Sequence, residues 1–269
     1  MIKSRNHSCH TRRMLWAAFA SCFALFAGTS ASLAPANAQD GLARIKREGV
    51  MRVANSGVYP PFESMEAGKL VGFDIDLSNL IAQELGVRAD IQVIDFKGLL
   101  PALKSGKADL LISGFTYTAE RAQQVAFSKP YYPNAVTVVV RESAPNITSK
   151  EGLAGKRIGV EMGTTGDREA RSVPGAEVKA YDTLMLAMKD LQNNRVDAVI
   201  SNLPPVRYLI NRNFKDLKVT HRYNEGHIAI AMRLEDRALV DAIDQALDKL
   251  KAGGQLRELE IRWFGEASK

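Results

Sequence analysis

The sequence predicts an α/β protein made of two units, each with a mostly parallel sheet covered by helices. Short apolar stretches alternate with helical stretches, which is the order expected of β-α-β units. The alternation runs once and begins again at Lys156, although no clear sequence repeat relates the two runs. With 269 residues, 46% hydrophobic and 25% charged, the chain has the length and composition of two globular domains of moderate size.

The first unit has three strands separated by helices. Its predicted elements are a helix at 41–48, a strand at 50–54, a helix at 74–85, a strand at 90–94, a helix at 99–105 and a strand at 108–113. Asp74 is a candidate cap of the second helix, and Gly86 and Gly106 stand where helices commonly end in glycine. Because residues 108–113 are almost continuously apolar, that strand is expected to be buried on both faces.

The second unit begins the same order again. Its predicted elements are a strand at 156–160, a helix opened by Gly163-Thr164-Thr165-Gly166, a strand at 178–180, a helix at 183–193 and a strand at 196–201. The last two helical stretches, 236–252 and 255–264, have no strand of their own and need a sheet on which to pack.

The N-terminal residues 1–38 have the pattern of a secretory signal peptide. Basic residues lead into an apolar run at 14–28, and Ala36-Asn37-Ala38 is a typical cleavage pattern. The alternative is a retained membrane anchor, but the apolar run is shorter than the about 20 residues that span a bilayer. The sequence therefore predicts an exported protein of a bacterial periplasm, and Arg12-Arg13 leaves open a twin-arginine export route.

Removal of this segment would change the charge and the thiol content of the chain. The net charge would fall from +6 to +2, because the segment holds four basic residues and no acidic one. No later basic run has interleaved aromatics, so the composition gives little support for nucleic-acid binding. Both cysteines, Cys9 and Cys22, lie in the segment, so the mature chain would have no disulfide, no thiolate metal site and no cysteine nucleophile.

Polar and aromatic side chains follow the carboxyl ends of the predicted strands, where open α/β sheets bind ligands. In the first unit they are Ser56, Tyr59, Phe62, Phe96, Ser113, Gly114, Thr116 and Arg121. In the second unit they are Glu161, Gly163, Thr164, Thr165, Ser201 and Asn202. Hydroxyls, helix-start N–H groups, one arginine and aromatic walls together predict a site for a small anion.

Arg121 and two helix starts contribute most to this prediction. A guanidinium matches a carboxylate with two parallel hydrogen bonds. Arg121 lies in the first turn of a helix expected to begin at Thr118, and the Gly-Thr-Thr-Gly segment begins a helix in the second unit. Free N–H groups at both helix starts could therefore hold one carboxylate from two sides.

Each of these residues also has a purely structural interpretation. Arg121 could be a surface residue paired with Glu120, and Asn202 could cap a helix. Tyr59 and Phe96 could be core aromatics. Only their common place at strand ends favours a binding site.

Four segments carry a family resemblance. They are GVMRVANSGVYPPFES, KLVGFDIDLSNLIAQELG, FKGLLPALKSGKADLLISGFTYTAERAQQVAFSKPYY and GKRIGVEMGTTG. With them the chain resembles the family 3 solute-binding proteins of bacterial ABC importers, the polar amino-acid-binding group, from about residue 41 to residue 264.

The resemblance implies a two-lobed periplasmic binding protein fold of type II, in which two α/β lobes are joined by two hinge strands. Residues 39–132 and 228–269 would form a discontinuous first lobe and residues 133–227 the second, with crossings near Tyr132 and His227. The implied function is to capture an amino acid or similar small carboxylate by hinge closure and deliver it to membrane permease subunits. The implied protein is a monomer with no cofactor, no metal and no nucleic-acid partner.

The resemblance also implies roles for single residues. Arg121 is similar to the carboxylate-binding arginine of the family, and Thr116 and Thr165 to its supporting donors. Ser113 and Gly114 are placed to bind the amino or carboxylate group. The family's aromatic pair around the ligand side chain corresponds to Tyr59 and Phe96, whereas Phe62 is expected to pack in the core.

Two positions depart from the family pattern. Asn202 stands where the family usually has an aspartate that binds the α-ammonium, and a neutral amide binds such a group less strongly. Ser56 stands where binders of cationic amino acids often have an acid. Its presence argues against an arginine or lysine ligand unless Glu161 supplies the charge.

The alternative function is that of an enzyme. Cyclohexadienyl dehydratases, which act on arogenate or prephenate, share this fold and need a proton donor in a desolvated cleft. In the similar enzymes a glutamate follows the second-lobe strand, where this chain has Asn202-Leu203-Pro204-Pro205. Glu161 is the one other candidate acid near the expected cleft, so the sequence favours a binding protein.

Overall fold

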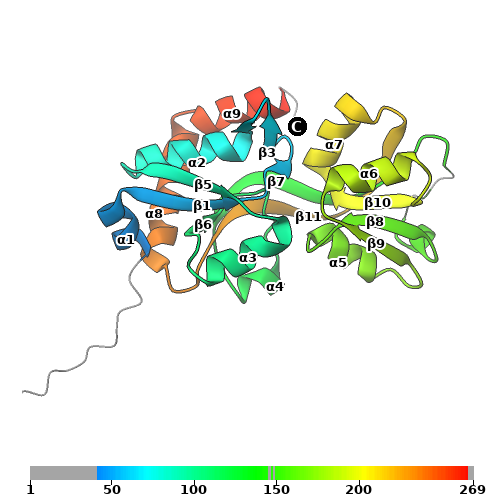
Figure 1. Cartoon of the computed structure of the whole chain (residues 1–269), viewed down its shortest axis with the longest axis horizontal. Coiled ribbons are helices and arrows are strands. Elements are labelled where there is room, and N and C mark those ends of the chain that lie inside the picture. The colour runs from blue at the N-terminus through cyan, green and yellow to red at the C-terminus, as the bar shows by residue number, and fades with distance from the viewer. Residues whose placement is uncertain (1–40, 145–146, 148, 266–269) are drawn as a thin grey trace, which may run out of the picture. The chain divides into compact units, whose positions relative to one another are not determined.

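The computed structural model of the chain describes residues 41–144, 147 and 149–265 (Figure 1). The chain divides into two compact units, Met1–Ala36 and Asn37–Lys269, and the description below concerns the second. The predicted signal peptide, residues 1–38, lies outside the described residues. In the ranges that are described, no helix is long and apolar enough to cross a membrane.

The predicted elements are found, with their ends shifted by a few residues. The helices are α1 Gly41–Glu48, α2 Phe73–Glu84, α3 Phe96–Lys104, α4 Ala119–Ala122, α5 Thr165–Arg171, α6 Leu184–Gln192, α7 Leu203–Asn213, α8 Arg237–Ala252 and α9 Gln255–Phe264. The strands are β1 Val50–Asn55, β2 Val58–Tyr59, β3 Glu63–Glu66, β4 Lys69–Val71, β5 Arg88–Val93, β6 Leu110–Leu111, β7 Ala126–Arg141, β8 Arg157–Glu161, β9 Glu177–Tyr181, β10 Ala198–Asn202 and β11 Leu217–Met232.

Eight strands form one sheet in the order β5-β1-β6-β11-β7-β10-β8-β9 (Figure 1). The strands β5, β1 and β6 are parallel at one end of this order, and β10, β8 and β9 are parallel at the other. Between them lie β7 and β11, two antiparallel strands of 16 residues each. The prediction of two parallel α/β units is therefore confirmed, and the shared pair of long strands joins them.

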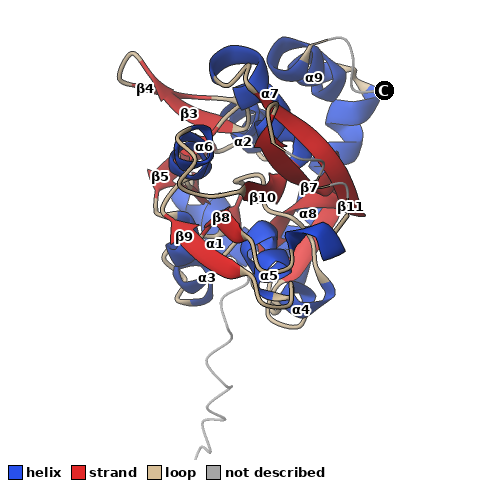
Figure 2. Ribbon diagram, turned by 90° about the vertical axis from the view of Figure 1, so that its right-hand side faces the viewer, coloured by secondary structure: helices blue, strands red, loops and turns tan. Residues whose placement is uncertain are grey.

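The crossings expected from the family resemblance fall at matching places on these two strands. Tyr132 of β7 pairs with Ile228 of β11, and Pro133 pairs with His227. Figure 2 shows β7 and β11 running side by side. The exact lobe boundaries, 132 and 228, stay a prediction.

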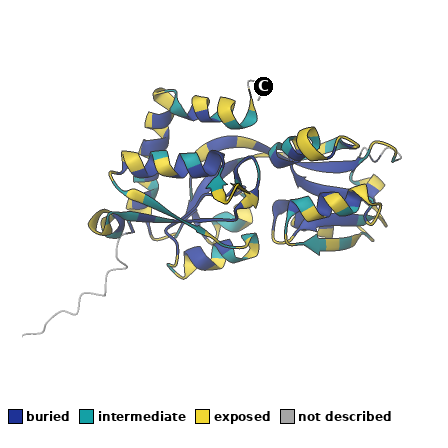
Figure 3. Cartoon of the chain, turned by 45° about the horizontal axis from the view of Figure 1, so that its top comes forward, coloured by how far each residue is buried: buried dark blue, intermediate teal, exposed yellow. Residues whose placement is uncertain are grey.

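The two C-terminal helices, α8 and α9, pack on the first half of the protein, and α8 contacts the sheet as the sequence predicts. The helix α8 buries Leu239, Ile243, Leu247 and Leu250, which recur at three- and four-residue spacing on one face. This face packs against β7 of the sheet, and α8 also contacts α1, α2 and α9. Figure 3 shows the same division on most helices, with one side buried and the other exposed. The end of the chain thus completes the half of the protein in which it began.

One predicted feature, the capping role of Asp74, is wrong. Gly72 takes the position before α2, and Asp74 lies inside the first turn with its side chain fully buried. Its Oδ2 accepts hydrogen bonds from the main-chain N–H of Gly114 at 2.6 Å and from the hydroxyl of Tyr131 at 3.0 Å. The carboxylate therefore holds the loop after β6 against α2 instead of capping the helix.

The two halves of the sheet share one ion-pair arrangement. Asp109, just before β6, accepts from the main-chain N–H of Arg52 at 2.9 Å and from its guanidinium at 2.9 and 3.2 Å. Asp197, just before β10, accepts in the same way from Arg157, at 2.9, 2.8 and 3.1 Å. The two β-α-β units are thus similar in detail as well as in the order of their elements.

Candidate functional site

The candidate residues lie at or just beyond the carboxyl ends of strands in both halves, some at strand ends, some in loops and some in the first turns of helices. The structure brings several of them into direct contact. The hydroxyl of Tyr59 lies 3.5 Å from that of Ser201, and the amide nitrogen of Asn202 donates to the hydroxyl of Thr116 at 3.2 Å. Residues from the first and second α/β units therefore meet directly, at the place where the sequence analysis expects the cleft.

Arg121 reaches across this cleft from α4. Thr118 caps that helix by accepting from the main-chain N–H of Arg121 at 3.1 Å, which fixes the arginine in the first turn. Its guanidinium donates to the carbonyl oxygens of Thr116 at 2.8 Å and Gly163 at 3.2 Å. It also lies 4.0 Å above the ring of Phe115. The arginine is thus held in place by neutral groups alone.

Arg121 forms no ion pair with an acidic side chain of the described residues. Glu120, the partner considered in the structural alternative, is bonded instead to Arg168 at 2.9 Å. Burial, with a smaller contribution from the nearby charge of Arg168, lowers the pKa of Arg121 to about 10. An anion bound at this guanidinium would favour its charged form and offset that cost.

Asn202 joins the two predicted donors Thr116 and Thr165. Its amide oxygen accepts from the hydroxyl of Thr165 at 3.0 Å, while its amide nitrogen donates to Thr116. The hydroxyl of Thr116 also accepts from the side chain of Asn134 at 3.0 Å. Asn202 stands at the start of α7, but its side chain makes no capping hydrogen bond. The alternative role as a helix cap is therefore not the one this side chain takes.

Thr164 uses its hydroxyl within its own helix start. It accepts from the main-chain N–H of Asp167 at 3.2 Å and donates to the carbonyl of Glu161 at 2.7 Å. This capping arrangement orients the first turn of α5 toward the cleft. Thr164 therefore contributes to the site by fixing the main chain at the start of α5.

The two candidate aromatic residues, Tyr59 and Phe96, each pack against a different phenylalanine. Tyr59 stacks on Phe62 with ring centroids 6.3 Å apart, and Phe96 packs against Phe115 at 5.8 Å. Phe62 is fully buried, as expected. Gly114 has a φ of 52°, and a Cβ there would lie 2.9 Å from the Tyr59 ring. Glycine at this position therefore lets the tyrosine lie against the loop that follows β6.

Two buried acids near the site, Glu63 and Asp74, were missed by the sequence analysis. Glu63 accepts from the hydroxyls of Ser56 at 2.8 Å and Ser113 at 2.5 Å. Burial raises the pKa of Asp74 to about 7, and burial together with the charge of Asp74 raises the pKa of Glu63 well above its ordinary value. No local pattern marks an acid that turns inward from a short hairpin or a first helical turn.

Glu161 is the third buried acid, at the end of β8. Its side chain is 1% exposed, and neither carboxylate oxygen has a hydrogen-bond partner among the described residues. Burial raises its pKa to about 8, and the nearby main-chain N–H of Leu184, which is not placed for a hydrogen bond of good geometry, lowers that pKa only in part. These acids do not form a metal site: in the described part of the chain no three His, Cys, Asp or Glu side chains are grouped to hold an ion.

A two-lobed fold with polar side chains gathered where its halves meet is the architecture of a ligand-binding protein. Residues 51–266 match the family described as bacterial extracellular solute-binding proteins, family 3, and the chain belongs to that family. The match covers nearly all of the described residues.

Individual relatives agree with this assignment. The chain is 34% identical to ABC transporter arginine-binding protein 1 of Escherichia coli over 216 residues, which is 78% of this chain and 88% of that protein. It is 30% identical to the L-cystine-binding protein TcyJ of Escherichia coli over 233 residues, 85% of this chain and 88% of that protein. Among solved structures, a mutant of ArgBP from T. maritima matches with a TM-score of 0.81 and 37% identity, over 84% of this chain and 100% of that one.

These findings decide between the two functions considered from the sequence. The family is one of solute-binding proteins, and the relatives described above are named as binding proteins. The chain is therefore a solute-binding protein and not an enzyme. The two-lobed fold expected from the resemblance is confirmed as well.

Proposed function

We propose that this protein captures a free amino acid in its interlobe cleft, as the periplasmic substrate-binding component of an ABC importer. Arg121 is the observation that carries the proposal. It is a half-buried cation whose hydrogen bonds go to two carbonyl oxygens, and it lies beside helix starts from both halves. The family and the names of the relatives support an amino-acid ligand.

The α-carboxylate of the ligand binds at the guanidinium of Arg121, which matches it with two parallel hydrogen bonds. Thr116, Thr165 and Asn202 supply further donors and acceptors next to it. The side chain of the ligand extends between Tyr59 and Phe96. Because these groups come from both halves, the bound ligand holds the halves together.

The partners in this proposal are the membrane permease subunits of the importer. One chain supplies every residue of the candidate site, so the working unit is a monomer. Light scattering of the purified mature protein tests the monomer, and co-purification with permease subunits expressed from the same genome tests the partner.

The first experiment is a thermal-shift screen of the mature protein against the twenty standard amino acids. A ligand that binds only the folded state, present at 100 times its dissociation constant, stabilises the protein by about 2.7 kcal/mol. A screen without any stabilising amino acid would contradict the proposed function.

Replacement of the guanidinium tests the proposed carboxylate site. We expect Arg121→Ala to weaken the binding of any hit by about 2–5 kcal/mol, because a buried ion pair loses one partner. Calorimetry measures the affinity, and circular dichroism checks the fold. Arg257→Ala on α9, where the arginine pairs with Glu260 at the surface, is the matched control. A near-normal affinity of Arg121→Ala would return the arginine to a structural role.

A further inference from the structure

Glu161 stands apart from the other buried acids because both of its carboxylate oxygens lack a hydrogen-bond partner among the described residues. Asp109 and Asp197, by contrast, are each held by an arginine. An isolated buried carboxylate is very unfavourable, so such a group either carries a proton or receives a cation from outside the protein.

Among the described residues, no lysine or arginine acts on the carboxylate of Glu161. Burial raises its pKa and the N–H of Leu184 lowers it. The titratable groups that face it are Tyr59 of β2 and Glu63 of β3, both of whose pKa values its charge raises, and Tyr181 of β9, its partner in the sheet. Two tyrosines and a second acid supply no positive charge, so they cannot neutralise the carboxylate of Glu161.

Glu161 and Arg121 are separate charges in one cleft. Burial raises the pKa of Tyr59 most, and the charge of Glu161 raises it further. Burial lowers the pKa of Arg121, and Tyr59 in turn raises it slightly. The carboxylate of Glu161 forms no ion pair with Arg121 among the described residues. Each of the two charges is therefore available to a different group of one ligand.

The α-ammonium has its own place beside the carboxylate. The side chain of Asn202 donates a hydrogen bond to the hydroxyl of Thr116. The main-chain carbonyl of the same threonine accepts one from Arg121. The amide of Asn202 is therefore at the Arg121 end of the cleft, where the α-carbon of the ligand lies. This leaves Glu161 for the ligand side chain.

We propose that Glu161 binds a positively charged group on the side chain of the ligand, so that this protein selects cationic amino acids such as L-arginine or L-lysine. The inference rests on the proposed function, because it takes Arg121 as the carboxylate site. Ser56, which stands where an acid was expected for such ligands, instead donates to Glu63. The acid that serves a cationic ligand in this chain comes from the other half of the protein.

Calorimetry with L-arginine and L-citrulline tests the proposal, because citrulline has nearly the same shape and a neutral side chain. We expect the wild-type protein to bind L-arginine at least about 30-fold more tightly than L-citrulline. Glu161→Gln should weaken L-arginine binding by a similar factor and leave L-citrulline nearly unchanged. Glu177→Gln, an exposed glutamate on β9, is the control and should change neither.

The pH dependence gives a second readout. At neutral pH the carboxyl of Glu161, with its pKa raised to about 8, carries a proton that must leave when a cation binds. The affinity of the wild-type protein for L-arginine should therefore rise with pH between about 6 and 8, by up to about tenfold per pH unit. Glu161→Gln should lack this part of the rise, whereas contributions from Glu63 and Asp74 remain in both proteins.

Three results separate the inference from the function on which it rests. Equal L-arginine affinity of wild type and Glu161→Gln would overturn the inference, and so would a wild-type preference for L-citrulline or for neutral amino acids. In both cases Arg121-dependent binding of some amino acid would leave the proposed function standing. If none of the twenty amino acids binds the wild-type protein, both proposals fail. The wild-type preference needs no variant, so it decides even if Glu161→Gln does not fold.

Discussion

Asn202 accepts a hydrogen bond from one threonine and donates one to another, so a single neutral amide fixes the helix start of α5 against the loop after β6. The family resemblance implies an aspartate at this position. An aspartate could keep both contacts, because the hydroxyl of Thr116 can donate as well as accept. The difference between the two residues is therefore mainly one of charge beside the α-ammonium.

This difference leads to a prediction for Asn202→Asp. With L-arginine as ligand we expect binding to strengthen by about fivefold, or about 1 kcal/mol, because a charge-assisted hydrogen bond replaces a neutral one. A ligand without an α-ammonium should instead bind more weakly, because an uncompensated carboxylate would enter a closed cleft. Calorimetry of both forms near neutral pH measures the sign. Identical affinities would mean that Asn202 does not contact the ligand.

The sequence indicates the candidate residues that have local signals, and it missed the buried acids that have none. Arg121, Thr116 and Asn202 follow strand ends, where the topology of an α/β sheet already points to a ligand. Glu63 and Asp74 are acids that serve hydroxyls and a main-chain N–H inside the protein. Their burial depends on contacts between segments far apart in the chain, which no local pattern contains.

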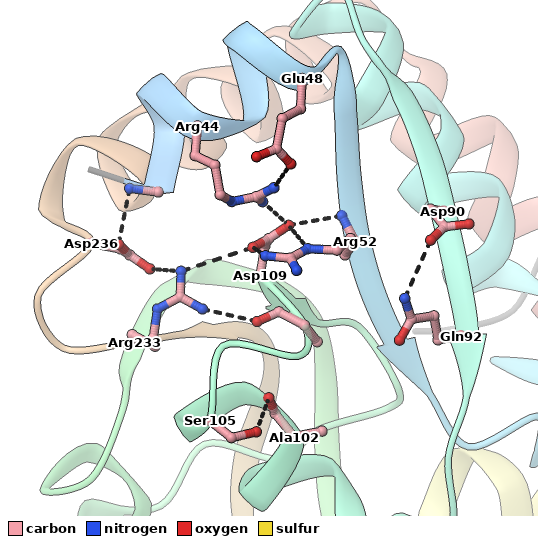
Figure 4. A network of polar contacts seen from close by, with 12 residues as sticks. Arg44, Glu48, Arg52, Asp90, Gln92, Ala102, Ser105, Asp109, Arg233 and Asp236 are labelled. Atoms are coloured by element: carbon pink, nitrogen blue, oxygen red, sulfur yellow. Dashed lines mark hydrogen bonds and ion pairs between the residues drawn. The ribbon is translucent and has the colours of Figure 1, made fainter. Parts of the chain in front are cut away.

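The paired elements β1–β6 and β8–β10 are each joined at one end by an arginine and an aspartate, but the two pairs differ in burial. The side chain of Asp109 is fully buried and contacts Arg44 and Arg233 in addition to Arg52 (Figure 4). The side chain of Asp197 is 28% exposed and pairs with Arg157 alone. The aspartate–arginine pair should therefore contribute more to the stability of the first half than to that of the second.

We predict that Asp109→Asn destabilises the protein much more than Asp197→Asn. The first substitution removes a fully buried carboxylate that three arginines share, and Arg52 loses its ion pair while Arg44 and Arg233 keep Glu48 and Asp236, which together costs about 3 kcal/mol. The second removes a partly exposed pair, which contributes about 1 kcal/mol or less. Urea denaturation of the two variants measures the difference, with each serving as the control for the other. Equal losses would mean that the three-arginine network around Asp109 adds nothing to a single pair.

At the level of elements, the sequence predicted the helices and strands with regular periodicity and missed the two long strands that join the halves. The long strands β7 and β11 were not predicted, because Pro130 and Pro133 interrupt one and residues 220–227 of the other are largely polar. Their pairing, with several register shifts, is a contact between distant segments. The repeat was missed as well: Asp109-Leu-Leu-Ile-Ser113 and Asp197-Ala-Val-Ile-Ser201 share only three residues, the aspartate of the ion pair, a core isoleucine and the serine beside the candidate site.

In the whole molecule, β7 and β11 are the covalent connections between the two halves of the sheet. The charged contacts that cross the cleft at its surface, Arg168 with Glu120 and Lys97 with Asp182, are exposed pairs. Exposed pairs contribute about 0–1 kcal/mol each and weaken in salt. These pairs add little to the few neutral hydrogen bonds that also cross between the halves, so a ligand that contacts both halves should shift the molecule toward its closed form.

The last prediction concerns this closure. We expect the radius of gyration of the mature protein in solution to decrease when L-arginine saturates it, because the ligand contacts both halves and the two long strands allow a hinge motion. Small-angle X-ray scattering at physiological salt measures the change. Arg121→Ala, in the same L-arginine concentration, is the control and should show no decrease, because its carboxylate site is lost. If the wild-type profile stays unchanged while calorimetry proves saturation, the ligand does not bind between the two halves, and both Arg121 and Glu161 need another explanation.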